Sequence, residues 1–408
     1  MKMKATFAVV AMCCGAFLCA ETLDLEDCIS IARAQNPSVR QQNLSTGIAE
    51  SKQKQAYSTL MPNLSVTSGL SASDQDNWAL GKSAGLQAGL TIYTPGMYSG
   101  IKAAKLSSEM SRASALSTEN EIVSQISALY YRILSTKRMI AVYRGNIAVA
   151  EENLKKTRAM YEMKVITESD VLKSETQKGD FEAQLISQEQ ALKSHLRAMN
   201  ILLGRDPGVP LELRDVDVNI VNIPDYTQAR EQMLEENPEY RAVRMQESLS
   251  RLSLQASKEN YLPSVSGSYH YTNYFDSNLS PGNGVSLSAS WTLFNGLARR
   301  QQVQQQKLRM DQSGIDVENT LRLLEQELQD LYTEFETYSS LIGINQRRLQ
   351  SASRDLEIVN QQYQLGKVTM LEQMQAQLAV LSAESSLVEA QYSRKRVEAE
   401  ILKLINKL

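Results

Sequence analysis

The stretch Ile126–Tyr161, ISALYYRILSTKRMIAVYRGNIAVAEENLKKTRAMY, carries the pattern that decides the fold. Apolar and small residues recur there at alternating steps of three and four and form one seam: Ile126, Leu129, Ile133, Thr136, Ile140, Tyr143, Ile147, Ala150, Leu154, Thr157 and Tyr161. A three-four spacing sustained over several heptads is typical of coiled coils. The stretch therefore predicts a long helix that packs along this seam against another helix.

The same seam returns 202 residues later, at Leu328, Leu331, Phe335, Tyr338, Ile342, Asn345, Leu349, Ala352, Leu356, Val359 and Tyr363. Other paired motifs repeat at an offset of 201: Asn36-Pro37 with Asn237-Pro238, and Met61-Pro62 with Leu262-Pro263. A period this long indicates a duplicated unit. We therefore predict a first repeat over 21–203, a linker over 204–224 and a second repeat over 225–408.

Each repeat is predicted to run in the order short helix, second helix, two strands, long helix, tip, return helix. The first helix of each repeat should end at its Asn-Pro pair, because the residue before proline avoids the α region. The predicted strand pairs lie at about 62–94 and 263–294, the long helices at about 97–161 and 297–363, the tips at 161–172 and 363–374, and the return helices run on to 203 and 408.

Composition narrows the class of protein. Aromatic residues make up 6% of the chain and prolines number nine, which suits long helices that pack shallowly against one another. The net charge is −3, and basic and acidic residues are interspersed, so the sequence has no basic stretch of the kind that binds nucleic acid. We therefore exclude the nucleic-acid-binding class. Residues 1–20 have the pattern of an export signal, with two lysines before an apolar run too short to span a bilayer. Lipid attachment at Cys19 is left open.

The predicted strands alternate strictly between apolar and polar residues. In the second repeat Val265, Gly267, Tyr269 and Tyr271 alternate with serine, histidine and threonine, and the first repeat behaves alike. Two environments fit: a soluble sheet on a core, or a membrane barrel that is apolar outward and polar inward. The export signal favours the barrel, and Trp291 near a strand end suits a membrane interface. Four strands cannot close a barrel, so several copies must pool theirs.

Both tips carry local signals for a tight helical hairpin. Gly366 supplies a helix end that tolerates positive φ. Thr167 stands three residues before Asp170, and Thr369 stands three residues before Glu372. This spacing predicts a capping box at the start of each return helix.

Taken together, these motifs resemble the TolC-like outer membrane efflux proteins. The resemblance rests on the paired Asn-Pro and Leu/Met-Pro steps, on Trp291-Thr-Leu-Phe-Asn-Gly296, on Leu203-Gly-Arg-Asp-Pro207, and on both tips, of which Tyr363-Gln-Leu-Gly366 is nearest the family form. It covers residues 22–408. Each motif alone is weak, whereas their order and duplication are specific.

The resemblance implies a mainly α-helical chain with a small membrane β-barrel portion, in which three copies pool four strands each into a twelve-stranded barrel. It places the barrel in the outer membrane and continues the helices as an α-barrel across the periplasm. It also implies that the tips close the inner end until a periplasmic adaptor and an inner-membrane pump, of the RND or ABC type, engage them. Exported molecules then pass without chemistry.

Site residues follow from the same resemblance. The implied gate residues are Asp170, Glu372, Gln375 and Val368, and the implied adaptor-docking residues are Lys164, Val165, Thr167, Gly366, Lys367 and Thr369. Glu372 would form an acidic ring, whose repetition around a threefold axis would raise its pKa, while Gln375 replaces a second acid of relatives. Val368 replaces an arginine that pairs with the acid at position 170, so that bond is expected to be absent or moved to Lys367 or Lys164. Lys164 replaces a glycine, which predicts a differently shaped turn.

Other interpretations remain beside these. Glu372 is also explained as a solvated acid that the helix dipole favours, and Tyr161 and Tyr363 are better explained by packing than by docking. No cluster of His, Cys and acids has metal-ligand spacing, and no nucleophile, phosphate or dinucleotide motif is present. The sequence thus predicts neither a cofactor nor an enzyme. The alternative class is a soluble periplasmic coiled-coil scaffold or adaptor.

Overall fold

The computed structural model describes residues 22–74, 78–216, 222–275 and 280–407, with side chains described outside 71–80. The predicted export signal at 1–20, including Cys19, lies outside the described residues. Among the described residues, no helix combines the length and the apolar character needed to cross a bilayer.

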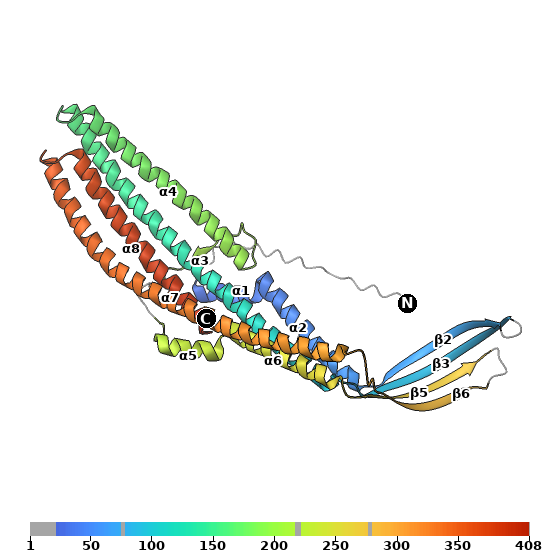
Figure 1. Cartoon of the computed structure of the whole chain (residues 1–408). Helices are drawn as coiled ribbons and strands as arrows, with labels where there is room; N and C mark the ends of the chain where they lie inside the picture. Colours follow the sequence, from blue (N-terminus) through green and yellow to red (C-terminus); the bar gives the residue numbers. More distant parts are fainter. Residues whose placement is uncertain (1–21, 75–77, 217–221, 276–279, 408) are drawn as a thin grey trace, which may run out of the picture. The chain divides into compact units, whose positions relative to one another are not determined.

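Two very long helices dominate the chain (Figure 1). Helix α3 (Met97–Glu162) has 66 residues and α7 (Ala298–Gln364) has 67. At about 1.5 Å per residue each is on the order of 100 Å long. Each is followed by a 35-residue return helix, α4 (Glu168–Leu202) or α8 (Met370–Leu404). The predicted long helices are confirmed, and much of the first seam is buried, with Ile126 and Ile133 fully inaccessible.

The shorter helices begin and end where the Asn-Pro pairs place them. They are α1 (Leu25–Gln35), α2 (Pro37–Tyr57), the 3-10 turn η1 (Ser58–Leu60), α5 (Tyr226–Glu236) and α6 (Pro238–Glu259). Each asparagine also caps the helix that follows it. The Asn36 carboxamide oxygen accepts from the Ser38 amide at 2.8 Å, and that of Asn237 accepts from the Tyr240 amide at 2.9 Å. The motif therefore ends one helix and begins the next.

The strands form one antiparallel sheet in the order β2-β3-β5-β6 (Figure 1). They are β2 (Asn63–Asp74), β3 (Trp78–Tyr93), β5 (Ser264–Tyr274) and β6 (Gly282–Ser290). The register of the strands places apolar residues opposite apolar ones and polar residues opposite polar ones: Val66 lies opposite Leu86, and Ser266 lies opposite Ser288. One face is therefore mainly apolar and the other mainly polar, as the alternation predicted.

The last strand is shorter than predicted. Sequence alternation extended it to Leu293, whereas β6 ends at Ser290. The next residues bond outside the ladder: the Trp291 indole N–H donates to the Tyr261 carbonyl at 2.9 Å, and Arg299 donates to the Thr292 carbonyl. Strand β3, by contrast, is paired on both sides and continues to Tyr93. Alternation alone does not report whether a strand has a partner along its whole length.

The chain divides into two compact units that cut across both sequence repeats. One comprises described residues within 1–35, 126–220 and 343–392, and the other comprises those within 36–125, 221–342 and 393–408. The duplication therefore describes the order of elements, whereas packing combines pieces of both repeats in each unit.

The first unit holds the two tips and part of the linker between the repeats. The linker contributes β4 (Glu212–Leu213), which pairs in parallel with β1 (Thr22–Leu23). Helix α3 fixes it further, because the Tyr130 hydroxyl donates to the Arg214 carbonyl at 2.5 Å. At the end of α4, Gly204 has φ +73°, and a Cβ there would lie 2.5 Å from the Gln35 carbonyl oxygen. Only glycine fits this link.

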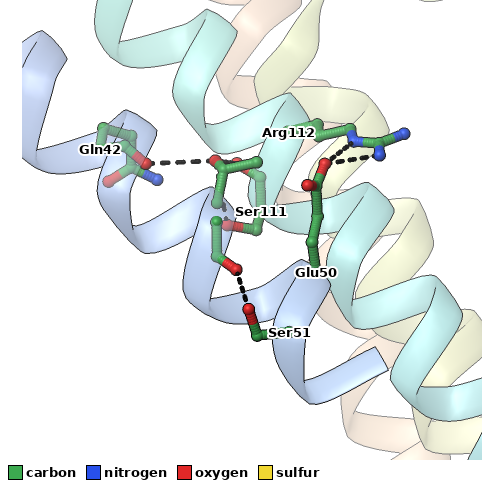
Figure 2. A network of polar contacts seen from close by, with 7 residues as sticks. Gln42, Glu50, Ser51, Ser111 and Arg112 are labelled. Atoms are coloured by element: carbon green, nitrogen blue, oxygen red, sulfur yellow. Dashed lines mark hydrogen bonds and ion pairs between the residues drawn. The ribbon is translucent and has the colours of Figure 1, made fainter. Parts of the chain in front are cut away.

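The second unit holds the sheet and a core at the C-terminus. This core joins residues of α5, α7 and the chain end: Ala229, Met233, Leu324, Leu328, Leu404 and Ile405. Figure 2 shows polar contacts between α2 and α3, where the Arg112 guanidinium bonds to the Glu50 carboxylate at 2.6 Å, close to Ser111. At the position related to Ser111 by 202 residues, the Ser313 hydroxyl lies 2.8 Å from that of Ser250.

Candidate functional site: the helical tips

The two turns at the tips share one backbone geometry. In the first, the Val165 amide donates to the Met160 carbonyl at 2.9 Å and the Lys164 amide donates to the Tyr161 carbonyl at 2.8 Å. In the second, the amides of Lys367 and Gly366 donate at 3.0 Å to carbonyls at the same relative positions. This pair of bonds is the Schellman motif, which ends a helix with one left-handed residue.

The left-handed residue is Gly366 in the second turn (φ 66°) and Lys164 in the first (φ 56°). The prediction of a differently shaped first turn is therefore wrong. Left-handed backbone costs a non-glycine residue roughly 1–2 kcal/mol. The hydrogen bonds of the motif and the cap that follows outweigh this cost, so lysine adopts the glycine conformation.

Replacing Lys164 by glycine should therefore stabilise the first tip by about 1 kcal/mol. Glycine removes the left-handed strain, but it also raises the conformational entropy of the unfolded chain, which offsets part of the gain. The measurement is hydrogen exchange of the Lys164 and Val165 amides, read as a local opening free energy. Lys367→Gly is the matched control, since Lys367 does not have positive φ. Equal protection in the two variants would contradict the expectation.

Each return helix starts with the predicted capping contacts. The Asp170 carboxylate accepts from the Thr167 hydroxyl at 2.8 Å and from the Thr167 amide at 3.3 Å. The Glu372 carboxylate accepts from the Thr369 amide at 2.6 Å and from its hydroxyl at 2.9 Å. Bonds from the Thr369 amide and hydroxyl lower the pKa of Glu372, and those from the Thr167 hydroxyl and amide lower that of Asp170. Both caps are thus formed above the ordinary carboxyl pKa and are lost only as pH falls through the lowered values.

Asp170 has its ion pair within its own helix. The Lys173 ammonium lies 3.5 Å from the Asp170 carboxylate. Among the described residues, the structure records no ion pair from Asp170 to Lys164 or Lys367. Val368, where the resemblance implies an arginine in relatives, is half-buried. Within the described part of one chain, Asp170 therefore makes no ion pair with either of the two lysines to which the bond between the tips could have moved.

The remaining sequence-predicted tip residues lie on the outer surface of the two turns. Glu372, Gln375, Lys164, Lys367 and both threonines are exposed. Large apolar side chains accompany them, and these are also exposed: Met163, Val165, Leu172, Leu365 and Leu371. Only Val165 was singled out from the sequence. The signal that could have found the others is an apolar residue in a tip that falls outside the helical seam.

Behind the tips, buried amides join helices of both hairpins. Gln377 is 2% exposed; its side chain accepts from the Gln177 amide at 3.4 Å and donates to the Asn146 carbonyl at 3.4 Å. Nearer the second tip, Gln373 donates to the Asn360 side chain at 2.7 Å. Sequence reasoning missed this polar layer, because glutamine is frequent throughout the chain and its burial depends on the facing helix.

The two tyrosines at the ends of the seams differ. Tyr363 is buried, and burial raises its pKa, which confirms that it packs. Tyr161 is 44% exposed, so the packing interpretation is wrong for it within this chain.

At the junction of sheet and helix, Trp291 is exposed and its indole is held by the Tyr261 carbonyl. The Arg299 guanidinium lies over the Tyr261 ring, 5.7 Å from its centroid. Gly296 and Leu297 both have positive φ and turn the chain into α7. Among the described residues, no group of three or more His, Cys, Asp or Glu side chains is arranged to hold a metal ion.

Two long helical hairpins with matched tips, joined to a four-stranded antiparallel sheet, define a duplicated, mainly α-helical class of protein. Within that class, a family model described as "Outer membrane efflux protein" matches residues 28–205 and 229–407. These spans cover most of the chain, so the chain belongs to the outer membrane efflux protein family.

Individual relatives agree with this assignment. The alkaline protease secretion protein AprF of Pseudomonas aeruginosa is 22% identical over 311 residues, which are 72% of this chain and 62% of AprF. The chain therefore matches less than two thirds of that relative. Among solved structures, CusC aligns with a TM-score of 0.86 at 16% identity, covering 95% of this chain and 93% of CusC. The outer membrane protein VceC of Vibrio cholerae aligns with a TM-score of 0.84 at 16% identity, covering 93% of this chain and 95% of VceC. At these identities the solved structures establish the fold.

Proposed function

We propose that the protein is a passive exit duct of the outer membrane, part of an efflux or type I secretion system. In this proposal three copies pool their strands into a twelve-stranded barrel, and the helices extend the bore through the periplasm. The tips close the inner end until a periplasmic adaptor and an inner-membrane pump open it. AprF is an alkaline protease secretion protein, and crystal structures of CusC concern the conformational changes that accompany transmembrane channel formation. Both support this assignment.

One observation carries the proposal: a small sheet with an uncovered apolar face and two edges without partners in the described chain. Val66 and Leu287 are exposed by 77% and 74%, and β2 and β6 each pair on one side only. An exposed apolar face of this kind on a soluble protein invites aggregation, and so does an open edge. Lipid on the apolar face and neighbouring copies at both edges satisfy all of these groups, and closure needs at least eight strands.

The tips are the proposed gate and docking surface. Their exposed apolar side chains, set among Lys164, Lys367 and the threonines, offer an adaptor both contact area and charge. Glu372 and Gln375 lie on the exposed first turns of α8, where three copies would bring three acids together. Removing the adaptor contact should leave the duct assembled but closed.

The direct experiment is membrane fractionation followed by mass measurement in detergent. The full chain should be recovered in the outer membrane, with a protein mass three times that of one chain, and should form pores in planar bilayers. Recovery in the soluble periplasm would instead support the scaffold or adaptor class. A detergent-independent monomer would overturn the duct outright.

The ring of acids has its own test, Glu372→Gln. Glutamine can keep the capping contact with Thr369, so the tip should stay folded. Loss of three carboxylates should lower the cation preference of the pore, because rings of acids attract cations. Reversal potentials under a salt gradient measure this preference, and Gln375→Glu should raise it. An unchanged preference in Glu372→Gln would leave Glu372 as a helix cap only.

A further inference from the structure

The strand hairpins of the two repeats have the same register. Asn63 lies opposite Gly89 in the first hairpin, β2 with β3. The residues 201 positions later, Ser264 and Ser290, lie opposite each other in the second hairpin, β5 with β6. A residue of one hairpin therefore has a structural counterpart 201 positions away in the other. A contact that one repeat makes thus indicates the contact that its counterpart is built to make.

The pairing between the repeats joins the second strand of one hairpin to the first strand of the other. Within the chain this pair is β3 with β5, in which Gln87 lies opposite His270. The counterpart of β3 is β6 and that of β5 is β2, and these two strands form the edges of the described sheet. The counterparts of Gln87 and His270 are Ser288 and Gly69. A pair of β6 with β2 that repeats the internal one would therefore place Ser288 opposite Gly69.

This register matches the character of both faces of the sheet. It sets Leu287 opposite Leu70 on the apolar face and Ser290 opposite Thr67 on the polar face. A shift by one residue would exchange the two faces along the whole strand. Within one chain, β3 and β5 lie between the two edges, and four strands cannot close a barrel. The two edges that meet must therefore belong to different copies.

Helix α2, which leads into β2, has an apolar surface that its counterpart keeps covered. Leu44 and Ile48 are 71% and 58% exposed, and with Gly47 they line an open groove of about 580 Å³. Their counterparts in α6, Met245 and Leu249, are half-buried within the chain. A surface that is covered in one repeat and uncovered in the other is a surface for a neighbouring copy.

Helix α7, which follows β6, differs from its counterpart in the same way. Leu308 is 58% exposed, whereas Leu106 of α3, 202 residues earlier, is half-buried. Inside the chain, α3 is bound to α6, because the Glu259 carboxylate accepts from the Gly96 amide at 3.1 Å and from the Ser99 hydroxyl at 2.9 Å. The contact between the repeats thus continues from the strands into the helices. The counterparts of this helix pair are α7 and α2.

We infer that each chain binds a second copy of itself edge to edge, with β6 antiparallel to the partner's β2 in the register that sets Leu287 opposite Leu70 and Ser288 opposite Gly69. The same contact brings α7 against the partner's α2 and covers the groove beside Gly47. The inference rests on the proposed duct, and it specifies which surfaces meet and which residues pair. Such an interface joins two unlike edges, so successive copies form a ring when the rotation closes.

The test is disulfide cross-linking of Ser288→Cys combined with Gly69→Cys, in the full chain extracted from membranes and oxidised with diamide. Opposite residues of an antiparallel pair have Cα atoms about 4.5–5.5 Å apart, which a disulfide can span. A Cβ at Gly69 would lie 3.5 Å from the Ser83 hydroxyl oxygen, an ordinary contact. Cys28 is buried and stays in place. Most of the chain should run as covalent dimer and trimer on a non-reducing gel, and as single chain after reduction.

Gln87→Cys combined with His270→Cys is the matched control. This pair is the internal counterpart of the tested pair, so it should form its bridge within one chain and add no mass. Leu287→Cys combined with Leu70→Cys repeats the test at the next position. Neighbouring pairs alternate between the wider hydrogen-bonded and the closer non-hydrogen-bonded spacing, so one of the two tested pairs has the closer one.

Two further double variants report a shifted register: Ser288→Cys with Ser71→Cys, and Ser288→Cys with Thr67→Cys. In the inferred register each leaves the cysteines about 7–8 Å apart, so neither should cross-link. Cross-linking of a shifted pair overturns the inference. So does the absence of cross-links between copies in a protein whose internal control pair is bridged. If the mass in detergent is still that of a membrane trimer, the duct stands without this interface. If the chain is a soluble monomer, both proposals fail.

Discussion

Replacing Val285 by arginine should prevent the protein from assembling in the outer membrane. Val285 is 84% exposed and lies opposite Tyr269, which in turn lies opposite Ala88, close to the middle of the apolar face. Arginine at the midplane of a barrel costs about 2–4 kcal/mol. Three copies multiply this to about 6–12 kcal/mol for a trimer. The measurement is the amount of trimer recovered from outer membranes, against misfolded or degraded chain.

Ser286→Arg is the matched control, one residue further on the same strand and on the opposite face. Its hydroxyl lies 2.7 Å from that of Ser268, on the face that would line the bore. This variant should still insert and form trimers, while its conductance and ion preference change. If both variants insert equally well, the apolar face does not contact lipid. If neither inserts, the strand does not tolerate arginine on either face.

The parts of the fold that were predictable depend on local signals. Asn36-Pro37 and Asn237-Pro238 mark helix ends because proline restricts the residue before it and asparagine caps the residues after it. The caps at Thr167 and Thr369 need only residues within one turn. Period-two alternation likewise predicts the face on which each strand residue lies, because successive side chains of a strand point to opposite faces. These elements lie within a few residues of their predicted bounds.

What could not be predicted depends on residues far apart in the sequence. The end of β6 at Ser290 depends on Tyr261 and on the absence of a second neighbour for that edge in the described chain. The burial of Gln377 depends on α3 and α4. The first turn was mispredicted for a different reason: the strain of a left-handed Lys164 is small compared with the hydrogen bonds that the turn makes.

The ion pair between Lys395 and Glu398 is the clearest feature that depends on residues far apart in the sequence. In the sequence they are one more charged pair on a helix. In the structure they are almost fully buried, at 6% and 7% exposure, and the two charged groups lie 2.9 Å apart. The amide of Asn222, from the linker between the repeats, also donates to the Glu398 carboxylate at 3.3 Å. The linker is thereby attached to α8 by a buried carboxylate.

Glu398→Ala should therefore destabilise this region by about 3–5 kcal/mol, because it removes one partner of a buried ion pair. Lys395→Met combined with Glu398→Leu should recover most of the loss, since an apolar pair of similar volume removes both charges. Glu318→Ala, which breaks an exposed pair with Arg322 at 3.4 Å, should cost at most about 0.5 kcal/mol. Hydrogen exchange of amides 393–404 measures all three as opening free energies. If Glu398→Ala exchanges no faster than Glu318→Ala, water reaches the Lys395–Glu398 pair, and the carboxylate does not hold the linker to α8.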